Sequence, residues 1–296
     1  MQNDLSLIEI KKIVNAALSE DIGSGDITTA FLIPEDMVAS GAIVAEEDIV
    51  LAGIRVAEEV FKALDQDVRF EALVRDGDLI KAGTPIVCLH GKARTLLTGE
   101  RVALNFLQRL SGIATLSRRY RDIVSGFPVR IVDTRKTTPG LRFLEKYAVR
   151  AGGCWNHRYG LFDGILIKEN HIALTEGIAV AISSVKKKVP HTIKIEIEVS
   201  NIEEVREAVI GGADIILLDN MDIQMMREAV TIIREHKAKE ILPKEVLPKD
   251  ILIEASGGMT LDKVRDVAAT GVDIISIGAL VHSAVWANLS MDINKV

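Results

Sequence analysis

The stretch "IKIEIEVSNIEEVREAVIGGADIILLDN" (residues 193–220) contains one complete unit of a repeating pattern. Two short runs rich in Ile, Val and Leu enclose a segment whose apolar residues recur at helical spacing. Runs this apolar are typical of strands buried on both faces, and regular alternation with helices indicates a parallel sheet. The stretch therefore predicts a strand, a helix and a second strand parallel to the first.

The same unit recurs from about residue 130 onward. The remaining apolar runs are "VRIVDTRK" (129–136), "GILIKENH" (164–171), "ILIEASGG" (251–258) and "DIISIGAL" (273–280). Six such units, with room for a seventh, predict an α/β fold with a parallel β/α barrel, and a doubly wound open sheet is the alternative. No GxGxxG follows any of these runs, which weighs against a dinucleotide-binding fold.

The first part of the chain has a different pattern of apolar runs and turns. Residues 40–54 and 68–93 contain short strands joined by Gly and Asp turns, a pattern typical of an antiparallel sheet. A long helix is expected at about 95–123, between the two parts. We therefore predict an N-terminal domain over residues 1–112 and a barrel over residues 113–281. A helix over residues 282–296 is expected to pack back on the first domain.

Composition narrows the class of protein. The chain has 296 residues, a formal charge of −6 and 48% hydrophobic residues, which is ordinary for a soluble globular protein. It has no apolar run long enough to span a bilayer, and its first residues are polar, so neither a membrane partner nor a signal peptide is expected. Cys88 and Cys154 form no CxxC motif, which favours a reducing, cytoplasmic location. The acidity argues against nucleic acid as a partner.

One segment of this acidic chain is locally basic. Residues 132–171 carry seven Lys and Arg against four Asp and Glu, a local charge of +3. A small anionic ligand is the expected reason. Arg142, Lys146 and Arg150 recur at helical spacing and are expected on a solvated face or beside an interface.

Functional residues of a parallel barrel lie at the carboxyl ends of its strands. Those ends here carry charges or glycines: Thr134, Arg135, Lys136, Lys168, Glu196, Glu198, Asp219, Ser256, Gly257, Gly258 and Gly278. A Gly pair ahead of a helix start exposes backbone N–H groups to an anion, so Gly257–Gly258 and the Gly278 turn predict phosphate cradles.

The acids on these strands suggest a metal. Glu198 and Asp219 end neighbouring strands, and their carboxylates could approach one Mg²⁺. The alternative is a structural ion pair with Lys194 or Lys168. Glu196 lies deeper on the same strand and is expected to pair inside the barrel.

Several motifs together resemble a known family. "LSEDIGSGDITT" (18–29), "LTGERVALNFLQRLSGIAT" (97–115), the "DTRKTTPG" block, "NHRYGL", "LIKENH", "LLDN" and "EASGG" are similar to the quinolinate phosphoribosyltransferase family over nearly the whole chain. The resemblance implies an N-terminal α/β sandwich domain followed by an incomplete barrel of about seven strands. It also implies that quinolinate and phosphoribosyl pyrophosphate give nicotinate mononucleotide, pyrophosphate and CO₂, with Mg²⁺.

The resemblance also implies residue roles. It places quinolinate on Arg135, His157, Arg158 and Lys168, next to Thr134. It also has Arg101 reach the neighbouring subunit's site in a homodimer, with a hexamer as the alternative assembly. Catalysis falls to Lys136, Glu198 and Asp219, and metal binding to Glu198 and Asp219. Phosphate binding falls to Ser256, Gly257, Gly258 and Gly278, with His282 beside them.

Two departures from the family pattern stand out. Cys154 stands where the family usually has a third glycine, and Trp155 follows it. Residues 237–250 form a longer insertion, which is expected to be a surface loop. A related group found with molybdate transport genes shares the "TRKT-PG" block but lacks the "NHR" and "LIK" elements. A non-catalytic oxyanion-binding protein is therefore the second hypothesis, and the presence of both elements here favours the enzyme.

Overall fold

The structure is a computed structural model that describes residues 5–239 and 250–296. The chain divides into two compact units, each built from separate stretches of sequence. The first unit comprises residues 1–118, 136–154 and 280–296, and the second comprises residues 119–135 and 155–279. Of the insertion predicted at 237–250, residues 240–249 lie outside the described residues, and residues 237–239 belong to a helix and not to the expected loop.

The first unit contains an antiparallel sheet, as the short strands and turns predict. Its four strands lie in the order β12-β1-β5-β3, and every neighbouring pair is antiparallel. The strands are β1 (Val38–Ala45), β3 (Arg69–Ala72), β5 (Pro85–Lys92) and β12 (Leu289–Lys295). A separate pair joins β2 (Ile49–Val50) to β4 (Leu79–Ile80).

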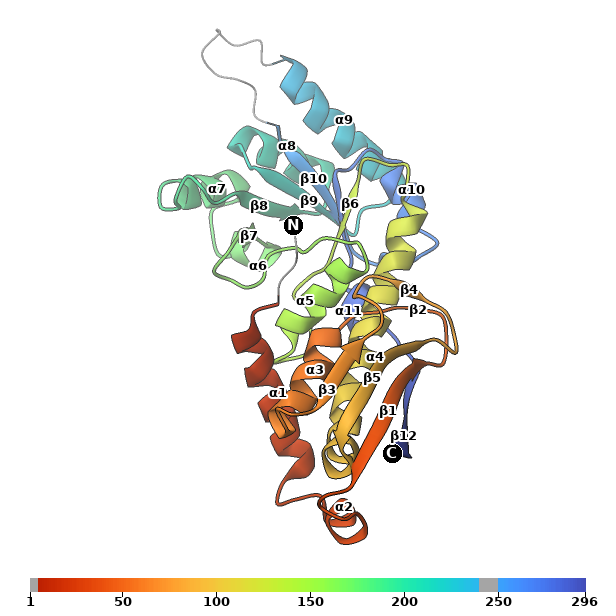
Figure 1. Cartoon of the computed structure of the whole chain (residues 1–296). Helices are drawn as coiled ribbons and strands as arrows, with labels where there is room; N and C mark the ends of the chain where they lie inside the picture. Colours follow the sequence, from red (N-terminus) through yellow and green to blue (C-terminus); the bar gives the residue numbers. More distant parts are fainter. Residues whose placement is uncertain (1–4, 240–249) are drawn as a thin grey trace. The chain divides into compact units, whose positions relative to one another are not determined.

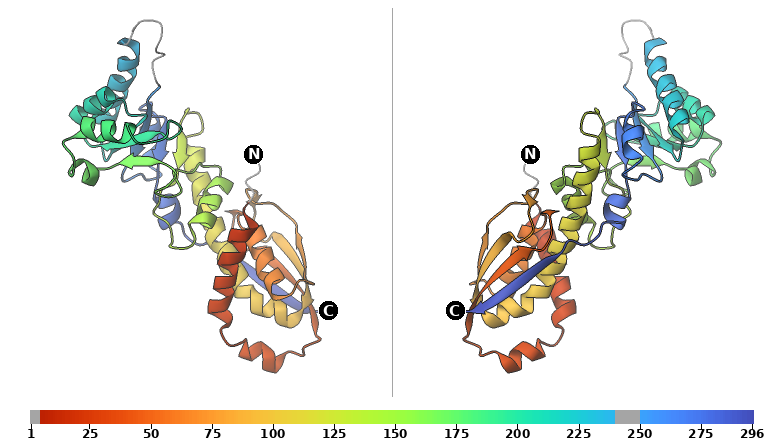
Figure 2. Two further views of the ribbon diagram at one scale, coloured as in Figure 1. Left: turned by 90° about the vertical axis from the view of Figure 1, so that its left-hand side faces the viewer. Right: turned by 90° about the vertical axis from the view of Figure 1, so that its right-hand side faces the viewer.

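Helices complete the first unit. They are α1 (Leu7–Ile22), α2 (Ile27–Leu32), α3 (Ile54–Leu64), the first part of α4 (Ala93–Ile123) and α5 (Arg142–Ala151). The α1 and α3 helices pack against each other on one face of the sheet (Figure 2). The side chain of Asp26 accepts from the backbone N–H of Thr29 and so caps the start of α2.

The predicted helix over residues 282–296 is wrong. A short helix, α11 (Ala279–His282), ends at residue 282, and Leu289–Lys295 form strand β12, which pairs with β1. Leu289 and Met291 are buried, whereas Ser290 and Asp292 are not. This period of two fits a strand, and the open edge of β1 supplies the hydrogen-bonding partner.

The second unit contains the parallel sheet (Figure 1). Its six strands lie in the order β6-β11-β10-β9-β8-β7. They are β6 (Arg130–Val132), β7 (Ile165–Ile167), β8 (Ile195–Val199), β9 (Ile215–Asp219), β10 (Leu252–Ser256) and β11 (Ile274–Ser276). The order follows the chain from β7 to β11, and β6 pairs with β11. That arrangement is a barrel open between β6 and β7, which excludes the doubly wound alternative.

About seven strands were expected, and the described sheet has six. On the open side of β6 a single parallel bridge joins Val132 to Trp155. The backbone N–H of Trp155 donates to Ile131 O and the N–H of Asp133 donates to Trp155 O. The chain therefore runs beside β6 for too short a distance to form a seventh strand.

Helices follow the strands of the second unit. They are α6 (Glu169–Ile172), α7 (Ile178–Lys186), α8 (Ile202–Gly211), α9 (Ile223–Lys239) and α10 (Val264–Ala268). The α8 helix begins where the Asn201 side chain accepts from Glu204 N, and it ends at Gly212, whose φ of 71° favours glycine. No helix among the described residues is both long and apolar enough to cross a membrane.

One predicted surface is wrong in part. Arg142, Lys146 and Arg150 do recur on α5, but Lys146 is fully buried, with 0% of its surface exposed. Six consecutive residues of α5, from Leu144 to Val149, are buried, so this helix is covered nearly all round. A solvated face is therefore absent at Lys146.

Candidate functional site

Nine of the predicted site residues fall at the carboxyl ends of the parallel strands, in one unit. Strand β7 is followed by Lys168, β8 carries Glu198, and β9 ends at Asp219. Strand β10 ends at Ser256 and is followed by Gly257 and Gly258. Thr134 and Arg135 follow β6, and Gly278 follows β11. The carboxyl ends of parallel strands form one edge of the sheet, as predicted for a barrel mouth.

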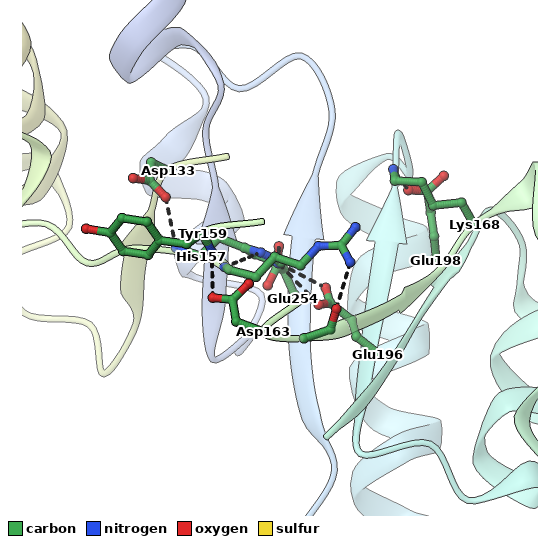
Figure 3. A network of polar contacts seen from close by, with 10 residues as sticks. Asp133, His157, Tyr159, Asp163, Lys168, Glu196, Glu198 and Glu254 are labelled. Atoms are coloured by element: carbon green, nitrogen blue, oxygen red, sulfur yellow. Dashed lines mark hydrogen bonds and ion pairs between the residues drawn. The ribbon is translucent and has the colours of Figure 1, made fainter. Parts of the chain in front are cut away.

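A buried carboxylate anchors the segment that carries His157. Asp133 directly follows β6 and has 0% of its surface exposed. Its two oxygens accept from the backbone N–H of His157 at 2.9 Å and from Asn156 Nδ2 at 2.7 Å. The end of β6 thus fixes the backbone of the segment that follows Trp155 (Figure 3).

His157 points at two acids inside the barrel (Figure 3). Its Nε2 lies 3.2 Å from Glu196 Oε2 and 3.6 Å from Glu254 Oε1. Both acids are buried, with 4% and 1% of their surface exposed. The expected internal pairing of Glu196 is confirmed, although its partner is His157. Burial and the charge of Glu196 raise the pKa of Glu254 to about 7.

Two guanidinium groups lie close enough to repel each other. Burial and the positive charge of Arg135 lower the pKa of Arg158, and the acids Glu196 and Asp163 act in the opposite direction. The Nη1 atom of Arg158 donates to Gly164 O at 2.7 Å. Asp163 holds the intervening turn by accepting from Tyr159 N and Gly160 N. An anion bound between the two guanidiniums would relieve their repulsion.

Glu198 is engaged in an ion pair. Lys168 Nζ donates to Glu198 Oε2 at 2.5 Å, and the lysine side chain is 48% exposed against 16% for the glutamate. Of the two lysines considered for this pairing, Lys168 is therefore the partner. Lys194 precedes β8 and is exposed. On the next strand, Asp219 accepts from the side-chain amide of Asn220 at 2.8 Å.

The turn after β10 is a narrow backbone loop. Gly257 and Gly258 have φ angles of 97° and 56°, in the region that favours glycine. A Cβ added at Gly257 would lie 2.2 Å from Asn220 Oδ1. Asn220 itself has φ 53°, and its N–H donates to Ser256 O. The helix expected after these glycines is present as α10, which begins at Val264 and so leaves five residues between Gly258 and the helix. Any anion here would meet backbone N–H groups without that helix dipole.

The remaining predicted site residues belong to the first unit. Arg101 lies on α4 and is exposed, as are Lys136 and His282, whose Nδ1 is 2.8 Å from Ser283 Oγ. The segment after Lys136 is held by Glu145 of α5, which accepts from both the N–H and the hydroxyl of Thr138 at 2.8 Å. Glu145 is itself paired with Arg109 of α4.

Three residues of these networks escaped prediction from sequence. Asp133 and Glu254 lie within apolar runs. The only sequence sign of a functional role is that each lies two residues from a predicted site residue, and therefore on the same strand face. Glu254 lies two residues before Ser256 and shares its strand face. Glu145 lies on a helix whose charged residues were expected to face solvent. Nothing in the neighbouring sequence therefore predicts that Glu145 is buried.

Comparison with known proteins agrees with this architecture. Residues 26–111 match the quinolinate phosphoribosyl transferase N-terminal domain, and residues 113–292 match the C-terminal domain of that family. A probable nicotinate-nucleotide pyrophosphorylase (carboxylating) of Bacillus subtilis is 43% identical over 97% of this chain and 94% of its own length. A protein of the same description from Methanocaldococcus jannaschii is 42% identical over 95% and 96%.

Solved structures give the same result. The nicotinate-nucleotide pyrophosphorylase of Francisella tularensis superposes with a TM-score of 0.88 at 36% identity, covering 99% of this chain and 98% of the other. That of Ehrlichia chaffeensis gives 0.88 at 39% identity, covering 99% and 100%. Both family domains, the full-length relatives and the open parallel barrel agree, and the chain belongs to the quinolinate phosphoribosyltransferase family.

Proposed function

We propose that this protein is a carboxylating nicotinate-nucleotide pyrophosphorylase. It transfers the 5-phosphoribosyl group of phosphoribosyl pyrophosphate to quinolinate, and the products are nicotinate mononucleotide, pyrophosphate and CO₂. Membership of the family supports the reaction, and the geometry of the barrel mouth supports the substrates. We further propose a cytoplasmic location, on the composition of the chain and on the lack of a CxxC motif in its sequence.

The observation that carries the proposal is the set of cations at the barrel mouth: Arg135 follows β6, Lys168 follows β7, and Arg158 lies on the segment that Asp133 fixes. Arg135 and Arg158 lie close enough for the charge of one to lower the pKa of the other. Quinolinate carries two carboxylates at neutral pH, and arginine binds a carboxylate through two parallel hydrogen bonds. A dianion would pair with both guanidiniums, and Thr134 follows the same strand.

The reaction needs no general base. The attacking atom is the pyridine nitrogen, which has no proton to lose. As pyrophosphate departs, positive charge develops at the anomeric carbon, and carboxylates stabilise such a state. Glu198 and Asp219, on neighbouring strands, are the residues assigned to this role. Lys168 binds Glu198 in the described structure, so a substrate carboxylate would compete with Glu198 for Lys168. After transfer, the cationic ring nitrogen stabilises the negative charge left on the adjacent carbon when CO₂ is lost, and that carbon then takes a proton from water.

The donor set fits Mg²⁺ as the assisting ion. Mg²⁺ typically takes one or two protein carboxylates and completes its shell with substrate phosphates and water. Glu198 and Asp219 offer such oxygens, both partly exposed. The ion would neutralise charge on the leaving pyrophosphate. Lys136 would bind the same leaving group, and Ser256, Gly257, Gly258 and Gly278, with His282, would bind phosphate.

We also propose a homodimer in which Arg101 completes the partner's site, with a hexamer as the alternative assembly. The exposure of Arg101 on α4 supports the first part, because an exposed cation is available to a second subunit.

The test is turnover by the purified protein. With quinolinate labelled in the leaving carboxylate, phosphoribosyl pyrophosphate and Mg²⁺, labelled CO₂ and nicotinate mononucleotide should form in equal amounts. Omission of phosphoribosyl pyrophosphate should abolish both products. Nicotinate, which lacks the second carboxylate, should be a poor substitute. Tight quinolinate binding without either product would instead favour the oxyanion-binding hypothesis.

A further inference from the structure

A buried ion pair links two helices of the first unit. Glu145 of α5 has 0% of its side chain exposed, and the Arg109 side chain of α4 is 14% exposed. Glu145 Oε1 accepts from Arg109 Nη2 at 2.7 Å and from Arg109 Nε at 3.1 Å. A buried ion pair is weak evidence for stability, because the cost of removing two charges from water offsets their attraction. The other hydrogen bonds of the pair indicate a different role.

The carboxylate of the pair holds the segment that follows Lys136. Glu145 Oε2 accepts from the backbone N–H of Thr138 at 2.8 Å, and Oε1 accepts from the Thr138 hydroxyl at 2.8 Å. Residues 136–140 lie outside any helix or strand, and Lys136 and Thr138 are exposed. An exposed stretch without regular structure keeps one conformation only where its backbone is anchored. Glu145 therefore restricts where the backbone near Lys136 can lie.

The guanidinium of the pair holds the segment that carries His282. Arg109 Nη2 also donates to Val281 O at 2.9 Å, and Nη1 donates to Ala284 O at 3.2 Å. Val281 and Ala284 are buried, and the exposed His282 lies between them in the chain. One guanidinium thus anchors the backbone on both sides of the histidine.

Both anchored segments carry a residue assigned to phosphoribosyl pyrophosphate. Lys136 is assigned to its leaving pyrophosphate, and His282 is assigned to phosphate. A substrate with more than one phosphate-bearing group binds best to contacts that already have the right separation, because ordering loose segments on binding lowers affinity. The ion pair holds the two segments at once and so sets the separation of their backbones.

We propose that Arg109 and Glu145 are positioning residues for phosphoribosyl pyrophosphate: their buried ion pair holds the segments of Lys136 and His282 at a fixed separation. Neither Arg109 nor Glu145 contacts the substrate. The inference rests on the proposed function and deepens it, because it adds two residues that act through the assigned phosphate contacts.

The first experiment replaces the carboxylate. In Glu145→Gln the one remaining oxygen can still accept from Arg109, but the amide nitrogen then faces the N–H of Thr138, and two donors cannot bond. The KM for phosphoribosyl pyrophosphate should rise about tenfold, the scale of one lost hydrogen bond to a charged group. The KM for quinolinate should stay near that of the wild type. An unchanged KM for phosphoribosyl pyrophosphate overturns the proposal.

The second experiment replaces the guanidinium. In Arg109→Lys the ammonium can still pair with Glu145, but its single nitrogen cannot also reach Val281 O and Ala284 O. The KM for phosphoribosyl pyrophosphate should rise in this variant too. Glu59→Gln is the matched control, because Glu59 pairs with Lys11 at 3.8 Å in the same unit and should change neither KM. Equal increases in both KM values for Arg109→Lys would indicate general damage and overturn the proposal.

A double-mutant cycle separates positioning from a purely structural role. If Glu145 acts through Lys136, Glu145→Gln should raise the KM for phosphoribosyl pyrophosphate by about twofold or less in a Lys136→Ala background. Arg109→Lys should be coupled to His282→Ala in the same way. An increase as large in the Lys136→Ala background as in the wild type overturns the role assigned to Glu145.

The last experiment does not depend on turnover. Inorganic pyrophosphate with Mg²⁺ is titrated calorimetrically into the wild type, Glu145→Gln and Glu59→Gln, without quinolinate. Only Glu145→Gln should bind pyrophosphate more weakly, by about tenfold. Equal affinity in the three proteins, or no binding by the wild type, overturns the positioning role even if the wild type turns over its substrates. Absence of turnover in the wild type overturns the proposed function, and the titration then still decides the role of the ion pair.

Discussion

Lys168 and Glu198 illustrate how single residues at this site are already paired before a substrate arrives. The ion pair between them is 2.5 Å long, and the lysine side chain is 48% exposed. An exposed pair of this kind contributes little to stability, commonly below about 1 kcal/mol. Its loss should therefore affect chemistry far more than folding.

Replacing Glu198 tests this. Glu198→Ala should lower kcat by about 100-fold or more, because it removes a carboxylate from the developing positive charge. Asp219→Ala should act in the same direction. Steady-state kinetics at saturating substrates give the measurement. Glu203→Ala, on the exposed surface of α8, is the control and should leave kcat unaltered. Wild-type kcat in both site variants would refute the assignment.

Glu254 predicts a dependence of stability on pH. Its pKa is raised from 4.5 to about 7, so the folded state holds this proton more tightly than the unfolded chain does. Between these values the folded state binds more protons, and the free energy of unfolding should fall as pH rises. The resulting loss in the free energy of unfolding is complete above about pH 7 and is on the order of 3 kcal/mol.

Glu254→Gln removes this titration. Denaturant unfolding of the wild type and the variant from pH 4.5 to 8 should give curves that differ in slope, with the wild type losing more stability as pH rises. Glu203→Gln should follow the wild type. Parallel curves for wild type and Glu254→Gln would mean that Glu254 titrates normally.

Among the elements, β12 depends most on a partner distant in sequence. Residues Ala39–Ala45 of β1 pair with Leu289–Lys295 of β12 over the whole length of the strand. The buried side chains of Leu289 and Met291 lie on one face of it, and Gly41 leaves room for the Met291 side chain, whose Cε would be 3.0 Å from an added Cβ.

Charges on the buried face of β12 should be strongly destabilising. The double variant Leu289→Asp/Met291→Asp places two carboxylates in an apolar environment, and should lower the free energy of unfolding by about 3 kcal/mol or more. Asp292→Ala, on the opposite face, is the control and should stay within about 0.5 kcal/mol of the wild type. Urea unfolding measures both. A similar small effect in both variants would show that β12 is dispensable.

The sequence predicts elements where periodicity is strong. The six apolar runs became β6 to β11, and the long helix was found at Ala93–Ile123. The predictions failed where the secondary structure or the burial of a residue depends on partners distant in sequence. Nothing near Leu289 shows that β1 has an open edge, and nothing near Lys146 shows that α5 is enclosed. The importance of Glu254 and Asp133 likewise comes from their contacts with His157, which is distant from both in sequence.

At the scale of the whole molecule, the proposed dimer makes a test of subunit exchange possible. Arg101→Ala and Glu198→Ala subunits should each be nearly inactive alone. Mixing them allows heterodimers in which one site has both an intact Glu198 and an intact Arg101 from the other subunit. Up to about a quarter of wild-type activity should return if subunits assort randomly. Activity no higher than the sum of the separate variants would contradict a shared site.

The pairing of β1 with β12 also sets an order on biosynthesis. A ribosome completes β1 and β5 early, but the strand that covers the other edge of β1 is translated only after every strand of the parallel sheet. The nascent chain therefore carries an unprotected sheet edge throughout the synthesis of the second unit, and such an edge is a template for pairing with other chains. A chaperone that shields nascent β1 would find its binding site present during elongation and hidden once β12 has emerged.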